Sequence, residues 1–457
     1  MIVPRNRLLF WVAAIVLPFA LLGAVEPRAA GLSIFVIGGL AALALVDAVG
    51  SRRSLAGLSL QLPDVTRMSK DRAANLEIRI RNERLRTRTL RLALVLPPEI
   101  QSAREDALVE LPHDSEWSRF SWECLPRRRG NFKLETACLE TSSPFGFWDV
   151  RGKVPAATEF RVYPNLAQER KDLAALFLHR GGVGMHAQRQ IGKGREFEKL
   201  REYLPGDGFD EIHWKATAKR GRPVTKVFQI ERTQEVYVVI DASRLSARPA
   251  MGAGSPIAEA AEGESRPELP TALERFITAA LVLGLAAEEQ GDLFGLLTFT
   301  NQVENFIRAR NGKAHFSACR DALYLLQPRV VTPDFDEVCT FIRMRLRRRA
   351  LLVFLTALDD PVLSESFVRN MDLIRRQHLV LVNMLPPPGV APVFSDGAIS
   401  SVDQLYQHLG GHLLWQNLRG LEKVLQRRGV KFSLLKNERL SAQLVSEYLS
   451  VKRRQVL

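Results

Sequence analysis

Two apolar runs at the start of the chain constrain its fold more than any other feature. Residues 8–25 contain no charge, and residues 29–46 are again uncharged after the short polar break "EPR". Each run is about as long as the ~17–25 residues that a helix needs to cross a bilayer. Residues 1–54 are therefore predicted to form a two-helix transmembrane anchor, with spans at about 8–25 and 29–49.

Arginines flank both runs. Arg5 and Arg7 precede the first run, and Arg52 and Arg53 follow the second. Because basic flanks stay on the cytoplasmic side, we expect both termini and the bulk of the chain in the cytoplasm, beneath the inner membrane. The alternative is a cleaved signal peptide, but its apolar region is usually only ~7–15 residues long and no second span follows it.

Composition narrows the class of protein. With 46% hydrophobic and 25% charged residues among 457, the chain is typical of a folded protein. Its net charge of +14 is consistent with binding to nucleic acid, with binding to an anionic membrane surface, or with basic segments that set the orientation of the chain in a bilayer. The four cysteines form no C-x-x-C pair, which predicts reduced, mostly buried thiols in a reducing compartment.

The chain after the anchor divides into three parts. Residues 55–165 alternate apolar and polar side chains between proline and glycine turns, which predicts a small antiparallel β-sandwich. Residues 166–235 form a connector with a helical stretch and a glycine-rich loop, "GGVGMHAQRQIGKGREF". Residues 236–457 alternate strands and helices, among them a helix at 412–428, which predicts a doubly wound, mostly parallel sheet. Residues 248–268 are predicted to be a flexible loop.

Most catalytic motifs are missing from the sequence. There is no G-x-x-x-x-G-K-[ST], no strand that feeds a G-x-G-x-x-G, no H-E-x-x-H and no G-x-S-x-G. The two histidines of "HLGGH" are four residues apart, but two glycines weaken a helix there, so we interpret them as ordinary histidines. We expect no enzyme and no small-molecule substrate.

One strand end carries side chains that suit a metal ion. Asp241 and Ser243 follow the apolar run "VYVVI", at the sheet edge where open α/β folds place their ligands. Asp359 follows a later strand and can add a third oxygen. The three are candidate ligands for Mg²⁺, although two or three ligands are few for an ion that takes six.

A run of arginines, "RIRNERLRTRTLRL", offers a basic surface. Its alternation along strands favours a solvated face. Anionic lipid is the first alternative, because the run lies soon after the anchor. Nucleic acid is the second, but no aromatic residues interleave with the arginines, so we expect none to bind.

The stretch "REYLPGDGFDEIHWKATAKRG" crowds reactive side chains between the sandwich and the α/β part. Its "PGD" predicts a turn, and Trp214 is expected to bury its ring. We interpret the stretch as a structural joint or a surface that faces a partner. The alternative is a metal-dependent hydrolase that uses Asp207, His213 and Asp241. The signature residues of the stretch are Arg201, Tyr203, Gly206, Asp207, Trp214 and Lys215.

With the residues before it, "GREFEKLREYLPGDGFDEIHWKATAKRG" resembles the signature of a bacterial family catalogued as domain-of-unknown-function family fifty-eight. "RRRGNFKLE", "SSPFGFW", "FRVYPN", "GDLFGLLTFTNQV" and "YLSVKRR" resemble further parts of that family. The resemblance implies a von Willebrand factor A-like domain tethered to the membrane, without an established reaction. It also implies a MoxR-type AAA+ ATPase as partner, in protein assembly or maturation.

The sequence departs from the metal site that such a domain carries. The D-x-S-x-S pattern has Leu245 in place of its second serine, with Ser246 one place late, and Ala357 stands where an aspartate is usual. No threonine lies in "RARNGK", and Asp210 and Glu211 replace an arginine that is frequent in the signature. We therefore expect a non-enzymatic, membrane-anchored scaffold with an incomplete metal site and no certain cofactor.

Overall fold

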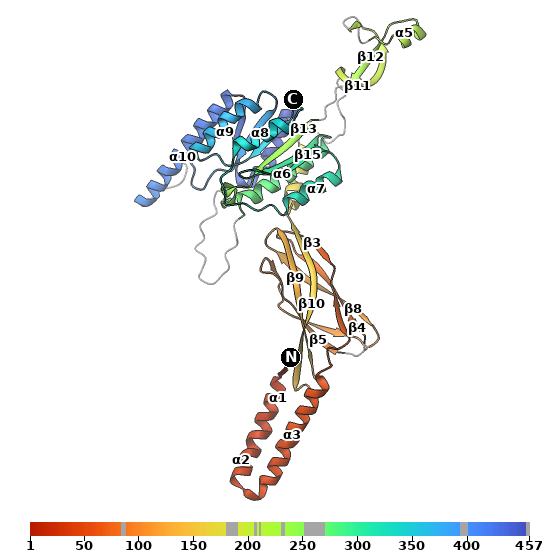
Figure 1. Cartoon of the computed structure of the whole chain (residues 1–457), viewed down its shortest axis with the longest axis vertical. Helices are drawn as coiled ribbons and strands as arrows, with labels where there is room; N and C mark the ends of the chain where they lie inside the picture. The colour runs from red at the N-terminus through yellow and green to blue at the C-terminus, as the bar shows by residue number, and fades with distance from the viewer. Residues whose placement is uncertain are drawn as a thin grey trace. The chain divides into compact units, whose positions relative to one another are not determined.

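The structure is a computed structural model of the chain, and its described residues form two compact units, Met1–Asn165 and Leu166–Leu457. Figure 1 traces both units with their helices and strands labelled. The described residues are 1–83, 88–179, 191–204, 208–209, 212–229, 234–250, 270–393 and 401–453.

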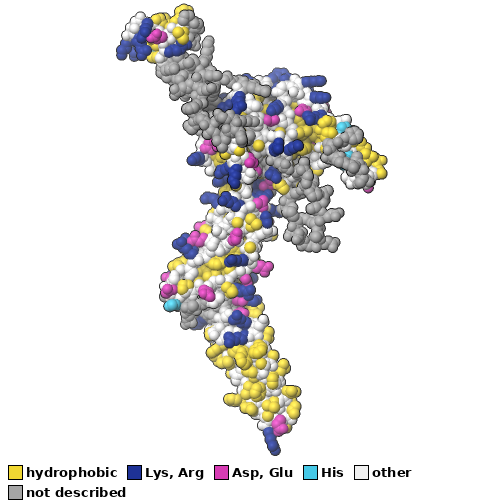
Figure 2. All heavy atoms as spheres, turned by 180° about the vertical axis from the view of Figure 1, so that it is seen from behind, with side chains coloured by type: hydrophobic (Ala, Val, Ile, Leu, Met, Phe, Trp, Pro, Cys, Tyr) yellow, Lys and Arg dark blue, Asp and Glu magenta, His cyan; other side chains and the backbone are white. Residues whose placement is uncertain are grey.

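The first unit begins with two apolar helical segments, each long and apolar enough to cross a membrane: Asn6–Val25 and Pro27–Ser51. A π-helical turn precedes Pro18, which lacks the N–H that would continue the regular ladder. Figure 2 shows hydrophobic side chains over the whole length of the pair. The elements are α1 (Asn6–Trp11), η1 (Val12–Val16), α2 (Leu17–Val25), η2 (Pro27–Ala29) and α3 (Ala30–Ser51).

The rest of the first unit is a β-sandwich, as predicted. Its strands are β1 (Ile2–Pro4), β2 (Leu58–Gln61), β3 (Val65–Ser69), β4 (Ala74–Asn82), β5 (Arg88–Leu94), β6 (Ile100–Gln101), β7 (Ala107–Leu111), β8 (Trp117–Pro126), β9 (Gly130–Ser142) and β10 (Trp148–Tyr163). One sheet has the order β1-β10-β9-β5-β7, and the other has the order β2-β4-β8-β6. Alternation puts Leu76, Ile78 and Ile80 of β4 in the core. The sequence analysis did not predict β1, nor the parallel pairing of β3 with β10.

Asp47 near the end of α3 joins the anchor to the sandwich. Its carboxylate is only 2% exposed and accepts hydrogen bonds from Ser143 Oγ at 2.6 Å, Phe145 N at 3.2 Å and Phe147 N at 3.3 Å. The indole of Trp148 donates to the carbonyl oxygen of Ala44 at 2.9 Å. A buried carboxylate needs such donors, so the motif "SSPFGFW" is the turn that holds the anchor helix.

The second unit contains a mixed, mostly parallel sheet of order β15-β14-β13-β16-β17-β18, in which only β15 runs antiparallel to its neighbour. This order confirms the predicted von Willebrand factor A-like fold class. The strands are β13 (Glu235–Asp241), β14 (Leu293–Phe299), β15 (Val303–Arg310), β16 (Leu351–Leu355), β17 (Leu379–Met384) and β18 (Lys431–Leu434).

Helices cover both faces of the sheet. One core lies under α6, α7 and α11, and the other under α8, α9 and α10, as Figure 1 shows in outline. Their bounds are α6 (Ala272–Glu289), α7 (Lys313–Leu323), α8 (Phe335–Arg345), α9 (Pro361–Ile374), α10 (Val402–Arg427) and α11 (Leu440–Arg453). Gly295 pairs with Tyr237 across β14 and β13, and a Cβ there would lie 2.4 Å from the tyrosine ring, so only glycine fits.

Asp292 ties the last helix to the sheet. It is buried at the start of β14, where Tyr448 donates a hydrogen bond to its Oδ2 and Lys452 Nζ lies 2.8 Å from the same oxygen. The backbone N–H of Gln234 donates to Oδ1 at 3.1 Å. A buried charge needs such partners, and these contacts join the segment "GDLFGLL" to the segment "YLSVKRR" in the structure.

The structure corrects two sequence predictions in this unit. The helix expected at 412–428 begins ten residues earlier, at Val402, because Ser401 caps it by accepting from the Gln404 N–H. The end of the predicted glycine-rich loop is not a loop but belongs to strand β11 (Ile191–Glu202). Before this strand, α4 (Ala167–His179) forms where a helical stretch was predicted. The predicted flexible loop 248–268 falls outside the described residues from residue 251 onward.

All four cysteines are free thiols, and three of them are buried, as predicted. Burial raises the pKa of Cys124 and Cys319 to about 11 and that of Cys339 to about 12. These three thiols therefore stay protonated at neutral pH and pack as small apolar side chains.

Candidate functional site

Asp241 ends the central strand β13 and is fully buried at the edge where ligands were expected. Its Oδ1 accepts a hydrogen bond from Ser243 N at 2.8 Å, and its Oδ2 accepts one from Thr356 Oγ1 at 2.7 Å. Burial raises the pKa of the Asp241 carboxyl, while the hydrogen bonds from Ser243 and Thr356 act in the opposite direction. Both oxygens of this carboxylate already have protein partners.

Ser243 and Asp360 serve as helix caps. Ser243 begins the short 3₁₀ helix η4 (Arg244–Ala247), and its hydroxyl accepts from Leu245 N at 3.4 Å. Asp360 begins α9 and accepts from Val362 N at 2.9 Å. Polar side chains at these positions satisfy backbone N–H groups that a helix start leaves without partners.

Asp359 is held by an arginine. Its Oδ2 pairs with Nη1 of Arg248, while its Oδ1 is buried without a hydrogen-bond partner. The guanidinium therefore supplies a positive charge at the side chain that was predicted to bind a cation.

Mg²⁺ prefers six oxygen ligands in octahedral geometry. Of the four carboxylate oxygens of Asp241 and Asp359, only Oδ1 of Asp359 lacks a partner. Among the residues that the structure describes, no group of three or more His, Cys, Asp or Glu side chains is arranged to hold a metal ion. The present donor set fits Mg²⁺ poorly, and binding by Asp241, Ser243 and Asp359 stays a prediction.

The sequence analysis missed several members of this edge. Thr300 is buried after β14 and donates to Glu304 Oε1 at 2.9 Å, and Glu304 pairs with Arg329 at 3.1 Å. Arg248 and Arg329 come from loops without periodicity, so no pattern in the sequence points to them. The motif position of Thr356, one residue before Ala357, was the one available signal.

The signature stretch forms a small antiparallel hairpin with a short helix. Strand β11 pairs with β12 (Val224–Gln229), and α5 (Trp214–Arg220) precedes β12. His213 caps α5, because its Nδ1 accepts a hydrogen bond from Ala216 N at 3.0 Å. Thr217 Oγ1 then accepts from Val224 N at 3.1 Å, which fastens the helix to the strand. His213 thus has a structural role here, and the hydrolase alternative stays untested.

The prediction that Trp214 buries its ring is wrong. Trp214 is 67% exposed, and Phe209 and Leu204 are 76% and 56% exposed. Because α5 begins at Trp214, its side chain projects from the first helical turn rather than into a core. The rings of Tyr203 and Phe209 lie 6.3 Å apart. We call Leu204, Phe209 and Trp214 the signature surface.

Charged residues surround the signature surface. Lys215 is exposed in α5, and Glu202 pairs with Arg222 at 2.6 Å. Arg201 is partly buried in β11. The predicted site residues Gly206 and Asp207, with Asp210 and Glu211, lie outside the described residues.

Arg79, Arg81 and Arg91 of the basic run form ion pairs on a solvated sandwich face. Arg79 pairs with Glu77 at 2.9 Å, and Arg81 pairs with Glu116 at 2.6 Å. These contacts agree with the solvated-face interpretation rather than with a free phosphate-binding surface.

The signature stretch lies in a part of the chain that matches a known protein family. Residues 199–389, which include the end of β11, α5, β12 and the strands β13 to β17 of the sheet, match the family described as "Protein of unknown function DUF58". This segment is similar to the DUF58 family. The match confirms the resemblance carried by the signature, and no curated protein matches the chain.

Solved structures similar to this chain share little sequence with it. The VWA domain of SpRpn10 is 10% identical with a TM-score of 0.27, covering 47% of this chain and 95% of that one. An aerotolerance-related membrane protein from Bacteroides fragilis NCTC 9343 is 10% identical with a TM-score of 0.29, covering 48% and 99%. An uncharacterized membrane spanning protein from Vibrio fischeri is 12% identical with a TM-score of 0.17, covering 48% and 98%. Similarity at this level supports no conclusion about partners or activity.

Proposed function

We propose that this protein is a non-enzymatic, membrane-anchored scaffold that binds a MoxR-type AAA+ ATPase through its signature surface. Both termini and the bulk of the chain lie in the cytoplasm, and the complex serves protein assembly or maturation. The observation that carries the proposal is the exposure of Trp214, Phe209 and Leu204 within one signature stretch. Partner identity comes from the family resemblance of the signature.

Exposed aromatic side chains on a firm support are typical of protein interfaces. Tryptophan and tyrosine are enriched among the few residues that contribute most of the binding free energy. The His213 cap and the Thr217–Val224 hydrogen bond fix α5, so Trp214 loses little backbone freedom on binding. Lys215 and the other basic residues of α5 add a charged rim, visible beside hydrophobic side chains in Figure 2.

Helix α10 offers a second apolar surface. Leu405, Leu409 and Leu413 are exposed and spaced four residues apart, so they form one stripe along the helix. Val402 and Tyr406 are exposed beside them. A stripe of this kind on a soluble domain supports a contact with another protein.

The anchor part of the proposal rests on the two apolar segments and on the charges at their ends. Both segments are apolar on all sides, as expected of helices that face lipid. Arg5 and Arg7 precede the first segment and Arg52 and Arg53 follow the second, which supports a cytoplasmic location for both ends.

The test is a binding titration with the full chain in detergent and the purified MoxR-type ATPase of the same organism. Wild type is compared with Trp214→Ala and with Trp117→Ala, a matched control that removes another exposed tryptophan. We expect Trp214→Ala to weaken binding by about tenfold or more, as for an interface hot spot, and Trp117→Ala to have no effect. Equal binding by all three, or no binding by wild type, would contradict the proposal.

A further inference from the structure

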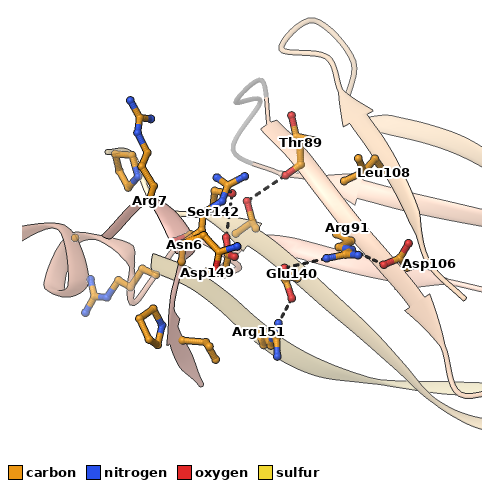
Figure 3. A pocket seen from close by; sticks show the side chains of 18 residues that line it. Asn6, Arg7, Thr89, Arg91, Asp106, Leu108, Glu140, Ser142, Asp149 and Arg151 are labelled. Atoms are coloured by element: carbon orange, nitrogen blue, oxygen red, sulfur yellow. Dashed lines mark hydrogen bonds and ion pairs between the residues drawn. The ribbon is translucent and has the colours of Figure 1, made fainter. Parts of the chain in front are cut away.

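A groove of about 1070 Å³ opens in the first unit where both apolar segments end. Its walls come from the start of α1, the residues after α3, and strands β5, β7, β9 and β10. Figure 3 shows side chains from these elements around one hollow. Because the hollow includes the first residues of one candidate membrane span and the end of the other, a membrane that holds both spans places it at headgroup depth.

Part of the positive charge in the groove is already balanced. Arg91 pairs with Asp106 and lies 3.8 Å from Glu140, and Arg151 pairs with Glu140 at 2.6 Å. Figure 3 draws these ion pairs as dashed lines along the sheet. The strand arginines are therefore structural and have no charge left over for a ligand.

The two arginines at the start of α1 differ from them. Arg5 Nη1 donates to Ser142 Oγ at 3.0 Å, and Ser142 in turn donates to Asp149 at 3.1 Å. Within the described part of the chain, neither Arg5 nor Arg7 pairs with a carboxylate, and Arg7 makes no hydrogen bond. Arg7 points away from the paired side chains in Figure 3.

Gly146 lets these two guanidinium groups approach each other. A Cβ at Gly146 would lie 3.3 Å from Arg7 Nη1 and 3.8 Å from Arg5 Nη1, so both guanidiniums lie close to Gly146 in the "SSPFGFW" turn. The φ angle of +74° at this residue also favours glycine. Two unpaired cations near the same residue repel each other, and an anion between them removes the repulsion. The Asp47 carboxylate lies within the same turn but is saturated by three donors.

We propose that this groove binds the phosphate of an anionic phospholipid headgroup between Arg5 and Arg7. Guanidinium groups suit phosphate because they donate parallel hydrogen bonds to two of its oxygens. The inference rests on the anchoring part of the proposed function and is independent of the ATPase partner. Asp47 of α3 hydrogen-bonds to the same turn, so a lipid bound there fixes the rotation and depth of the anchor.

The test is native mass spectrometry of the full chain in detergent with added phosphatidylglycerol or phosphatidylcholine. Arg7→Gln removes a guanidinium that makes no hydrogen bond or ion pair in the described part of the chain, and Arg28→Gln is the matched control at the other end of the segments. We expect wild type and Arg28→Gln to retain phosphatidylglycerol about tenfold better than Arg7→Gln, and phosphatidylcholine to be retained weakly by all three.

Two outcomes overturn the proposal. One is retention of phosphatidylglycerol by Arg7→Gln at the wild-type level. The other is displacement of the lipid by millimolar inorganic phosphate, which would make the groove a site for free phosphate.

Carbonate extraction of membranes from cells that express each form separates this inference from the anchor. If wild type stays in the carbonate-resistant fraction but retains both lipids equally, the headgroup site is wrong and the anchor stands. Wild type in the soluble fraction defeats the anchor and the headgroup site together.

Discussion

The sheet edge around Asp241 and the signature surface around Trp214 were the two candidate sites, and the structure builds them in opposite ways. At the sheet edge the carboxylate is fully buried and both its oxygens accept hydrogen bonds from the protein. At the signature surface the large apolar side chains of Leu204, Phe209 and Trp214 are exposed. The carboxylate oxygens of Asp241 are therefore already hydrogen-bonded within the protein. Burial of the exposed side chains of the signature surface against a partner would still lower the free energy.

The difference shows that the residue type alone does not determine whether a side chain has a structural role or is exposed to a partner. Asp241 and His213 both looked chemically active, yet one is a hydrogen-bond acceptor within the edge and the other caps a helix. Trp214 looked like a core residue and is exposed. Burial and partners decide the role of a side chain, and neither is visible in a motif.

The largest expected effect on the sheet edge comes from Asp241→Ala. The substitution leaves the Ser243 N–H and the Thr356 hydroxyl buried without their acceptor, which costs about 1–3 kcal/mol of unfolding free energy. Chemical denaturation of the full chain in detergent measures the loss. Trp214→Ala, which removes an exposed ring, should leave the unfolding free energy unchanged. If Trp214→Ala were the more destabilising of the two, the comparison would be wrong.

The pH dependence of stability is a second, smaller effect. Burial raises the pKa of Asp241 above its value in the unfolded chain, so the folded state binds the proton better. Its contribution to stability is full at pH below the unfolded pKa of 3.8 and is lost as pH rises through the folded pKa. Asp241→Asn cannot ionise and keeps both hydrogen bonds if Thr356 reverses its hydroxyl. We expect the melting temperature of this variant relative to wild type to rise between pH 4 and pH 8; a constant difference would argue against a raised pKa.

The smallest effect concerns Mg²⁺. In wild type, Arg248 already neutralises Asp359, so millimolar Mg²⁺ should leave the melting temperature unchanged. In Arg248→Gln that carboxylate loses its cation, and we expect Mg²⁺ to raise the melting temperature by one or two degrees. Arg244→Gln is the matched control from the same loop. A wild-type protein stabilised by Mg²⁺, with the effect lost in Asp241→Asn, would restore the metal site.

Much of the fold was predictable from the sequence because it depends on periodicity. The uncharged runs predicted the two apolar helices, alternation predicted strands such as β4, and the buried runs β13, β14 and β16 predicted the sheet. Strand β1 was not predictable, since three residues ahead of a helix carry no period and gain their pairing from β10. The early start of α10 was missed because its exposed leucines do not mark a core-facing side.

The candidate sites were less predictable than the fold. Sequence spacing put Asp241 and Ser243 together, and the structure links them directly. It did not reveal that Arg248 holds Asp359, since the two are 111 residues apart and join through tertiary packing alone. The exposure of Trp214 was missed for a related reason, because a tryptophan at the start of a short helix has the same sequence signature whether or not a core lies beneath it.

Photocrosslinking tests the contrast between the two regions most directly. A benzophenone amino acid is placed in the full chain either at Trp214 or at Arg244, an exposed residue next to Ser243 at the sheet edge. Each form is irradiated with the purified MoxR-type ATPase. We predict a crosslinked product from position 214 and none from position 244. Crosslinking from position 244 alone would show that the partner binds at the sheet edge and would contradict the account.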